Sequence, residues 1–202
     1  MQTIIKLLKT SVMKILNTFA LTVLSLVIME ADAQTDIPKG FSSGTITLAD
    51  GTRRSGFIKD YIRKDASVTF AATGHKKINY DGTDLLSAEI NGTKYLCIKG
   101  DFFKVLCEGE LSFLQKSSDA SGKLTYNGNE PIFSSGTDGK RDDYFVYNSN
   151  DKQLKLVSKK NFGDVAASSF ADCTAAKDKA KTINGDLSQF RGAVEEYNNR
   201  NR

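Results

Sequence analysis

The chain has 202 residues, 40% of them hydrophobic and 26% charged, and a formal net charge of +4. Its Lys and Arg residues are scattered among Asp and Glu, and basic clusters are no larger than doublets such as Arg53-Arg54 and Lys76-Lys77. A nucleic-acid-binding face needs contiguous basic residues with interleaved aromatics, so this composition excludes nucleic acid as an expected partner.

Residues 1–33 are predicted to be a signal peptide. Lys14 precedes a short apolar run, 15–28, which is followed by Ala31-Asp32-Ala33. A basic start, a short apolar run and small residues at the −3 and −1 positions form the pattern that a signal peptidase cleaves. Met13 is an alternative start, because Met13-Lys14 supplies the basic start by itself. No Cys follows the cleavage site, so lipid attachment is not expected.

The mature chain, from about Gln34, is expected to be periplasmic, associated with the outer membrane or secreted. The apolar run 15–28 is interrupted by polar residues such as Asn17 and Ser25, and a membrane span needs about 20 apolar residues. No stable membrane span is therefore expected after cleavage. The remaining length fits one domain of ordinary size, in which 34–157 forms a β-rich region and 158–202 a helical segment of the same domain.

The β-rich region contains short segments rich in β-branched and aromatic residues, separated by turn dipeptides. The turns are Asp50-Gly51, Asp81-Gly82, Asn91-Gly92 and Gly100-Asp101. The predicted strands are 45–48, 56–62, 68–71, 77–80, 85–90, 94–99, 102–107 and 111–115. Residues 116–142 are predicted to form a long loop, followed by a last hairpin of strands 144–147 and 154–157. Successive strands joined by tight turns pair antiparallel.

After Ser158 the hydrophobic period becomes helical. Apolar residues recur with helical spacing from Phe162 to Phe170, and Ser158 is the expected cap. A second helix is expected from Asp172, and Asp186 with Gln189 has the spacing of a capping box for a third. Strands first and helices last predict an α+β fold: an antiparallel sheet, or a small barrel-like β region, followed by about three C-terminal helices packed on it.

Several short motifs resemble those of a family of uncharacterised exported proteins of Gram-negative bacteria. The motifs are segment 44–51, Gly56-Phe-Ile58, segment 80–85, segment 103–109, Leu111-Ser-Phe113, Lys160-Asn-Phe162, segment 170–173 and Tyr197-Asn198. The resemblance implies a location in the envelope and a β-rich region followed by helices, and it implies no activity. The hairpin from Asp50-Gly51 to Gly56 has a weaker likeness to SH3-like and Sm-like barrels.

Candidate catalytic residues are few. His75 is the only histidine, so a Ser-His-Asp or Cys-His arrangement would have to be built around it. It lies between Gly74 and two lysines, with no acid in the segment to orient the ring, which favours an exposed turn.

Metal and modification sites are weakly indicated. The acids of 138–143 enclose Lys140 and Arg141, which does not fit a calcium loop, and the three cysteines lack the Cys-x-x-Cys spacing of a zinc site. Asn91-Gly-Thr93 matches a glycosylation acceptor and also a hairpin turn, and we favour the turn. No catalytic, cofactor-binding or metal-binding residue is therefore named.

Cys97 and Cys107 are predicted on neighbouring strands. With a two-residue turn at Gly100-Asp101, Cys97 would face Lys104 and the two sulfurs would lie on opposite sides; a longer turn would bring them to one face. We expect all three cysteines, with Cys173, to stay free and to pack as small apolar residues.

These observations favour an exported, non-enzymatic binding or structural module of the bacterial envelope, acting on an envelope protein or ligand that the sequence does not name. The alternative is a secreted hydrolase, for example a glycosidase, that uses dispersed carboxylates. A deep cleft containing two acids would distinguish the hydrolase. A membrane-surface helix is disfavoured, because the last helix carries Glu195-Glu196 beside Arg191.

The mature N-terminus should lie at Gln34 or within a residue or two of it, because Ala31 and Ala33 are the small pair best placed after the apolar run. Intact-mass measurement of the exported protein checks this position. Exported protein that retains Met1 or Met13 would contradict the prediction.

Overall fold

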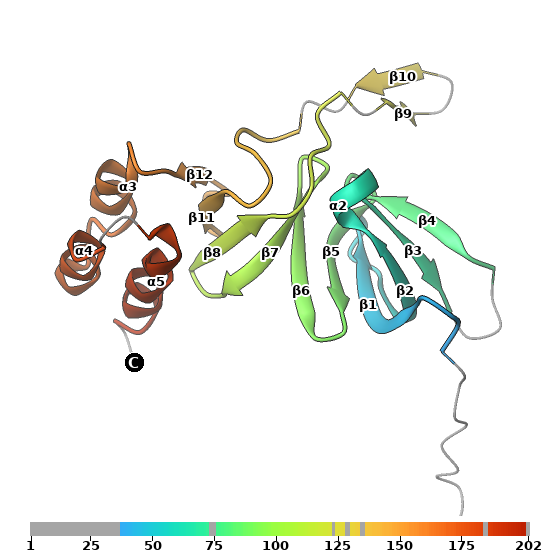
Figure 1. Ribbon diagram of the computed structural model, residues 1–202, viewed down its shortest axis with the longest axis horizontal. Coiled ribbons are helices and arrows are strands. Elements are labelled where there is room, and N and C mark those ends of the chain that lie inside the picture. The colour runs from blue at the N-terminus through green and yellow to red at the C-terminus, as the bar shows by residue number, and fades with distance from the viewer. Residues whose placement is uncertain are drawn as a thin grey trace, which may run out of the picture. The chain divides into compact units, whose positions relative to one another are not determined.

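The computed structural model describes residues 37–72, 76–122, 124–127, 130–133, 136–183 and 186–200, without the side chains of 124–127, 132 and 133. The predicted signal peptide and His75 lie outside these residues. The fold is α+β, as predicted: a large antiparallel sheet, with helices mostly in the C-terminal part of the chain (Figure 1). Each helix in the described residues falls short of the length and apolar character that a membrane crossing requires.

Ten strands form one antiparallel sheet in the order β12-β11-β8-β7-β6-β5-β1-β2-β3-β4. A separate hairpin of β9 and β10 is inserted between β8 and β11. The strands are β1 Ser42–Leu48, β2 Arg53–Tyr61, β3 Ser67–Ala71, β4 Ile78–Asp81, β5 Leu85–Ile90, β6 Thr93–Ile98, β7 Asp101–Cys107, β8 Leu111–Lys116, β9 Leu124–Asn127, β10 Glu130–Phe133, β11 Tyr144–Asn148 and β12 Leu154–Val157.

The half of the sheet from β4 to β6 is curled, and glycines permit the curl. Gly44 of β1 lies opposite Gly56 of β2, and a Cβ on Gly56 would lie 2.9 Å from the Phe70 ring. Glycines at such positions allow close approach and bending in a sheet. The curl brings Gly82, after β4, into a bridge with Gly100 at the β6–β7 turn. The ten strands nevertheless do not close, so the open sheet rather than the barrel-like form describes the fold.

The curled half buries its own hydrophobic cluster on one face. Ile46, Ile58 and Phe102 are almost completely buried there, and Ile62 joins them from α2, Ile62–Asp65, a short helix between β2 and β3. Residue 62 was predicted to be the end of a strand. The helical turn starts there instead, and the backbone N–H of Ile62 donates to the Asp60 carboxylate.

The second cluster joins the C-terminal helices to β8, β11 and β12. The helices are α3 Phe162–Ser169, α4 Thr174–Lys181 and α5 Phe190–Asn198, with the 3₁₀ turn η1 Leu187–Gln189 before α5. Phe190 is fully buried at the centre, with ring centroids 6.0 Å from Phe113 of β8 and 5.5 Å from Phe170. Helices of this length are marginal alone in water, so the packing of α3 and α5 on the sheet and of α4 on these two helices stabilises them.

The last helix is also tied to the sheet by an amide side chain. Asn198 Nδ2 donates to the Leu111 carbonyl at 2.8 Å, and Asn198 Oδ1 accepts from the Leu111 N–H at 3.1 Å. A Cβ on Gly109 would collide with this amide. Two motifs that are far apart in the sequence, 103–109 and Tyr197-Asn198, thus meet in space.

Four boundary predictions need correction. The first helix begins after Asn161, whose side chain accepts from Ser158, so Ser158 is not its cap. Thr174 rather than Asp172 begins α4. The predicted loop 116–142 contains the β9–β10 hairpin, and the β6–β7 turn consists of Lys99 and Gly100, both with positive φ, rather than Gly100-Asp101. Asp186 does cap the 3₁₀ turn, accepting from the Ser188 N–H.

Replacing Phe190 with Ala should lower the free energy of unfolding by about 3 to 5 kcal/mol, because the lost ring leaves a cavity between sheet and helices. Chemical denaturation monitored by circular dichroism measures this change. Leu86→Ala is the control, since Leu86 is 49% exposed and its truncation should cost at most about 0.5 kcal/mol. Equal effects of the two variants would contradict the central role of Phe190.

Candidate functional site

The most buried charged groups of the described residues are Asp101 and Lys116. Both side chains are 0% exposed, and Lys116 Nζ lies 3.1 Å from Asp101 Oδ2. They lie on β7 and at the end of β8, on neighbouring strands. Buried titratable pairs occur at active sites, so this pair is a candidate for a catalytic role.

Every remaining polar atom of the pair has protein partners. The Lys116 ammonium also donates to the carbonyls of Thr137 at 2.8 Å and Gly139 at 3.2 Å. Asp101 accepts from the Ala120 N–H at 2.7 Å and from the Thr137 N–H at 2.8 Å. The hydroxyls of Ser118 and Thr137 complete the shell, at 3.2 and 2.7 Å from the carboxylate.

This arrangement binds two loop segments to the sheet. Ser118 and Ala120 precede the β9–β10 hairpin, and Thr137 and Gly139 follow it, so one buried carboxylate and one buried ammonium hold both sides of its base. Neither residue lines the pocket between the β11–β12 hairpin and the helices or the hollow beside β4. The pair is therefore a structural clamp and not the candidate site.

Lys116→Met should lower the free energy of unfolding by about 3 to 5 kcal/mol, because it leaves the Asp101 carboxylate buried without its counter-ion. Asp101→Leu should have a comparable cost. The double variant should lose clearly less free energy of unfolding than the two single variants lose together. Denaturant titration of the wild type, the two single variants and the double variant measures this coupling. Additive costs would contradict a direct interaction.

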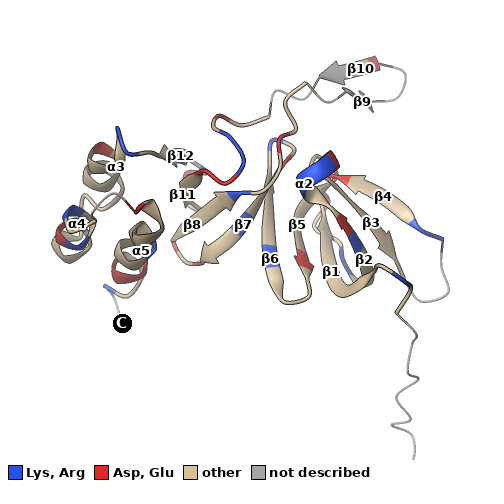
Figure 2. Ribbon diagram, in the orientation of Figure 1, with Lys and Arg blue, Asp and Glu red and all other residues tan. Residues whose placement is uncertain are grey.

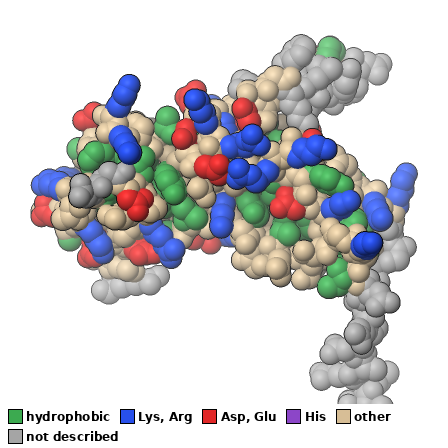
Figure 3. Space-filling view, in the orientation of Figure 1, with side chains coloured by type: hydrophobic (Ala, Val, Ile, Leu, Met, Phe, Trp, Pro, Cys, Tyr) green, Lys and Arg blue, Asp and Glu red, His purple; other side chains and the backbone are tan. Residues whose placement is uncertain are grey.

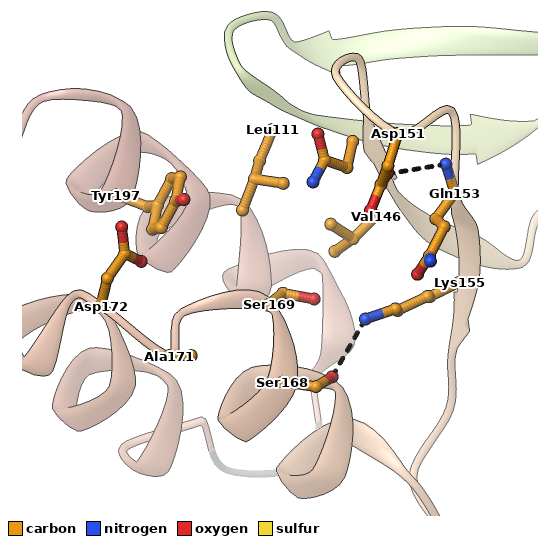
Figure 4. Close-up of a pocket in the computed structure, with 11 residues that line it drawn as sticks. Leu111, Val146, Asp151, Gln153, Lys155, Ser168, Ser169, Ala171, Asp172 and Tyr197 are labelled. Atoms are coloured by element: carbon orange, nitrogen blue, oxygen red, sulfur yellow. Dashed lines mark hydrogen bonds between the residues drawn. The ribbon is translucent and has the colours of Figure 1, made fainter.

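A polar pocket of about 240 Å³ lies between the β11–β12 hairpin and the helices (Figure 4). Figure 4 shows one wall made by side chains of the hairpin and the other made by side chains of the helical segment. The lining residues are Leu111, Val146, Asn148, Asp151, Gln153, Lys155, Ser168, Ser169, Ala171, Asp172 and Tyr197.

Two carboxylates line this pocket, and each already has a donor. Asp151 Oδ1 accepts from the Gln153 N–H at 3.0 Å, which shapes the turn before β12. Asp172 Oδ2 lies 3.4 Å from Arg200 Nε, and the Asp172 side chain is 60% exposed. A glycosidase needs one carboxyl kept protonated by burial or by a second acid nearby. Asp172 is instead largely exposed, and neither carboxylate lies against the other as a second acid would.

The other polar groups of the pocket are donors and acceptors that come from the hairpin and from α3. Lys155 Nζ donates to Ser168 Oγ at 3.2 Å, which links β12 to α3 across the pocket. Asn148 and Gln153 come from either end of the hairpin turn, and Ser169 comes from the last turn of α3. Such groups can hydrogen-bond a small polar ligand, but they include no activated nucleophile.

Tyr197 closes the pocket on the helical side with its ring covered. The Arg200 guanidinium lies 3.7 Å from the ring centroid, and the Phe170 ring centroid lies 5.7 Å away. Burial, with the nearby Glu110 carboxylate, raises the pKa of Tyr197 to about 12. The hydroxyl therefore stays protonated at neutral pH, and the covered ring offers no platform for stacking a sugar.

The acids of 138–143 do not converge on a common point. Asp142 pairs with Arg63 of α2 at 2.8 Å, and Asp143 accepts from the Lys140 N–H at 2.7 Å. Within the described ranges no group of three His, Cys, Asp or Glu residues comes together to hold a metal ion. His75 lies outside those ranges.

All three cysteines are free thiols. Cys97 faces Phe102 rather than Lys104, because the turn is one residue earlier than predicted. Cys107 faces Phe113 after a bulge. Because Cys107 follows Phe102 by about five residues on β7, it lies about 17 Å along the strand from it, at roughly 3.3 Å per residue. Separation along the strands, rather than opposite faces, keeps the two sulfurs apart. Burial raises the pKa of both thiols.

Sequence reasoning did not identify the pocket residues. The sequence predicts a hairpin of strands 144–147 and 154–157 and a helix from Asp172, and both predictions concern local backbone structure. Nothing in their spacing indicates that the turn and the helix start lie across one cavity from each other.

Charged groups of both signs are interspersed along the strands and helices (Figure 2) and over the surface seen in Figure 3. No protein-family model, no curated protein and no solved structure matches this chain. The geometry of the pocket is therefore the basis for a functional assignment.

Proposed function

We propose that this protein is an exported, non-enzymatic binding module of the bacterial envelope, which holds a small, uncharged polar ligand in the pocket between the β11–β12 hairpin and the helices. Export and the resemblance to envelope proteins come from the sequence and are parts of this proposal.

The observation that carries the proposal is the lining of the pocket. Asn148, Gln153 and Ser169 present neutral hydrogen-bonding groups, although Asn148 Oδ1 already accepts from the Asn150 N–H at 2.9 Å, and Asp151, Asp172 and Lys155 each have a protein partner too. A ligand with hydroxyl or amide groups can pair with the neutral groups without separating these partners. Ligand sites commonly combine a few placed polar groups with an apolar floor, and Leu111 and Val146 supply that floor.

The alternative is a hydrolase that uses Asp151 and Asp172. Both acids do line one cavity, which is the feature that would favour a glycosidase. Their existing donors and the exposure of Asp172 favour binding instead.

Ser169→Phe should abolish binding by filling the pocket. The probes are N-acetylglucosamine, glucose and N-acetylalaninamide, which are all uncharged, each titrated into the ¹⁵N-labelled mature protein and followed by amide chemical shifts. We expect at least one probe to shift the amides of Asn148, Gln153 and Ser169. Ala167→Phe is the matched control, since Ala167 is exposed on the same helix outside this pocket, and it should bind like the wild type.

Failure of all three probes to shift these amides would contradict the proposed ligand class. The hydrolase is tested with nitrophenyl glycosides. Turnover by the wild-type protein that disappears in both Asp151→Asn and Asp172→Asn would favour the enzyme over the binding module.

A further inference from the structure

A second hollow, of about 420 Å³, lies on the curled half of the sheet. It is formed by β2, β3, β4 and the residues next to them, at the end of the sheet opposite β12 in the strand order. Its lining residues are Arg54, Ser55, Phe70, Ala72, Lys76 and Ile78.

The apolar part of the hollow follows from the register. Phe70 of β3 lies opposite Ile58 of β2 on one side and opposite Ile78 of β4 on the other. Phe70 is 3% exposed, whereas Ile78 is 43% exposed and is one of the few large hydrophobic side chains left open to solvent among the described residues. An apolar group that covers this isoleucine removes its exposed apolar surface from water, which is favourable in free energy.

Two cations lie at the same hollow. Arg54 is on the same face of β2 as Gly56 and Ile58, and its Nη1 donates to the Tyr80 hydroxyl of β4 at 3.3 Å. The guanidinium therefore reaches across β3 along the edge of the hollow. Lys76 lines it just before β4, and none of the six lining residues is acidic. The hollow thus has two positive charges beside an apolar surface.

We propose that this hollow binds an organic anion with an apolar tail, of the class of medium-chain carboxylates. The carboxylate pairs with Arg54, whose fork of donors matches a carboxylate, and with Lys76. The tail covers Ile78 and Ala72. A small hydrophilic anion such as phosphate would leave this apolar surface open, and a neutral alcohol would offer the two cations no negative charge.

Calorimetric titration of the mature protein with octanoate tests the site, with acetate and octan-1-ol as the compounds that each lack one half of the ligand. Octanoate should bind at least about tenfold more tightly than either, because each lacks one of the two interactions. Octanoate should also shift the amides of Ala72 and Ile78 while leaving those of Asn148 and Ser169 unchanged, which separates this site from the polar pocket.

Arg54→Gln and Lys76→Gln should each weaken octanoate binding by about tenfold or more. Lys94→Gln is the control, because Lys94 is a partly exposed lysine of β6 that pairs with Glu108 outside this hollow. Circular dichroism checks that each variant is folded. If one variant loses its structure, the other still tests the site.

The proposal is overturned if octanoate binds no better than acetate and octan-1-ol, or if the two variants bind like Lys94→Gln. It is also overturned if the protein ignores free octanoate and binds vesicles of anionic phosphatidylglycerol, since the hollow would then serve a membrane surface. Octanoate binding that leaves the amide shifts of Asn148 and Ser169 unchanged supports this site alone, and the proposed function is then decided by the titrations with uncharged probes.

Discussion

The long excursion between β8 and β11 depends on one buried ion pair. Removing two charges from water has a large cost, and the attraction between them compensates only when the remaining donors and acceptors are also satisfied. Asp101 and Lys116 meet that condition, because backbone and hydroxyl groups from both sides of the excursion complete their hydrogen bonds. The pair therefore fixes where the chain leaves the sheet and where it returns. It also lets β11 pair with β8 across a long insertion.

The elements of this fold could largely be predicted from the sequence, because each has a local signal. Alternating β-branched residues and Gly-containing turns place the strands from β1 to β8, and the helical period after Ser158 places the helices. The order of strands has no such signal, since a turn indicates only that consecutive strands pair. That β5 returns beside β1, and that the sheet curls over Gly44 and Gly56, depends on contacts between distant segments.

The polar sites could not be predicted, for the same reason. Asp101 follows a glycine and has the composition of a turn, yet a one-residue difference in the turn makes it the first residue of β7 and buries it. Lys116 continues the alternation of β8 on the face of Leu114, where a lysine is expected only if a partner is present. Asp151 and Asp172 resemble ordinary turn and helix-start residues, and only the packing of helices on the sheet makes them neighbours of one pocket.

The position of β1 also bears on how the chain folds. β1 lies between β2, which follows it at once, and β5, which is made only after β3 and β4. Its pairing with β2 closes a short loop, whereas its pairing with β5 is non-local, and non-local strand pairs form slowly. During that interval the second edge of β1 exposes unpaired backbone groups, which is the template for pairing between separate chains. The pairing of β5 with β1 is therefore the step that removes this edge as a site for pairing between chains.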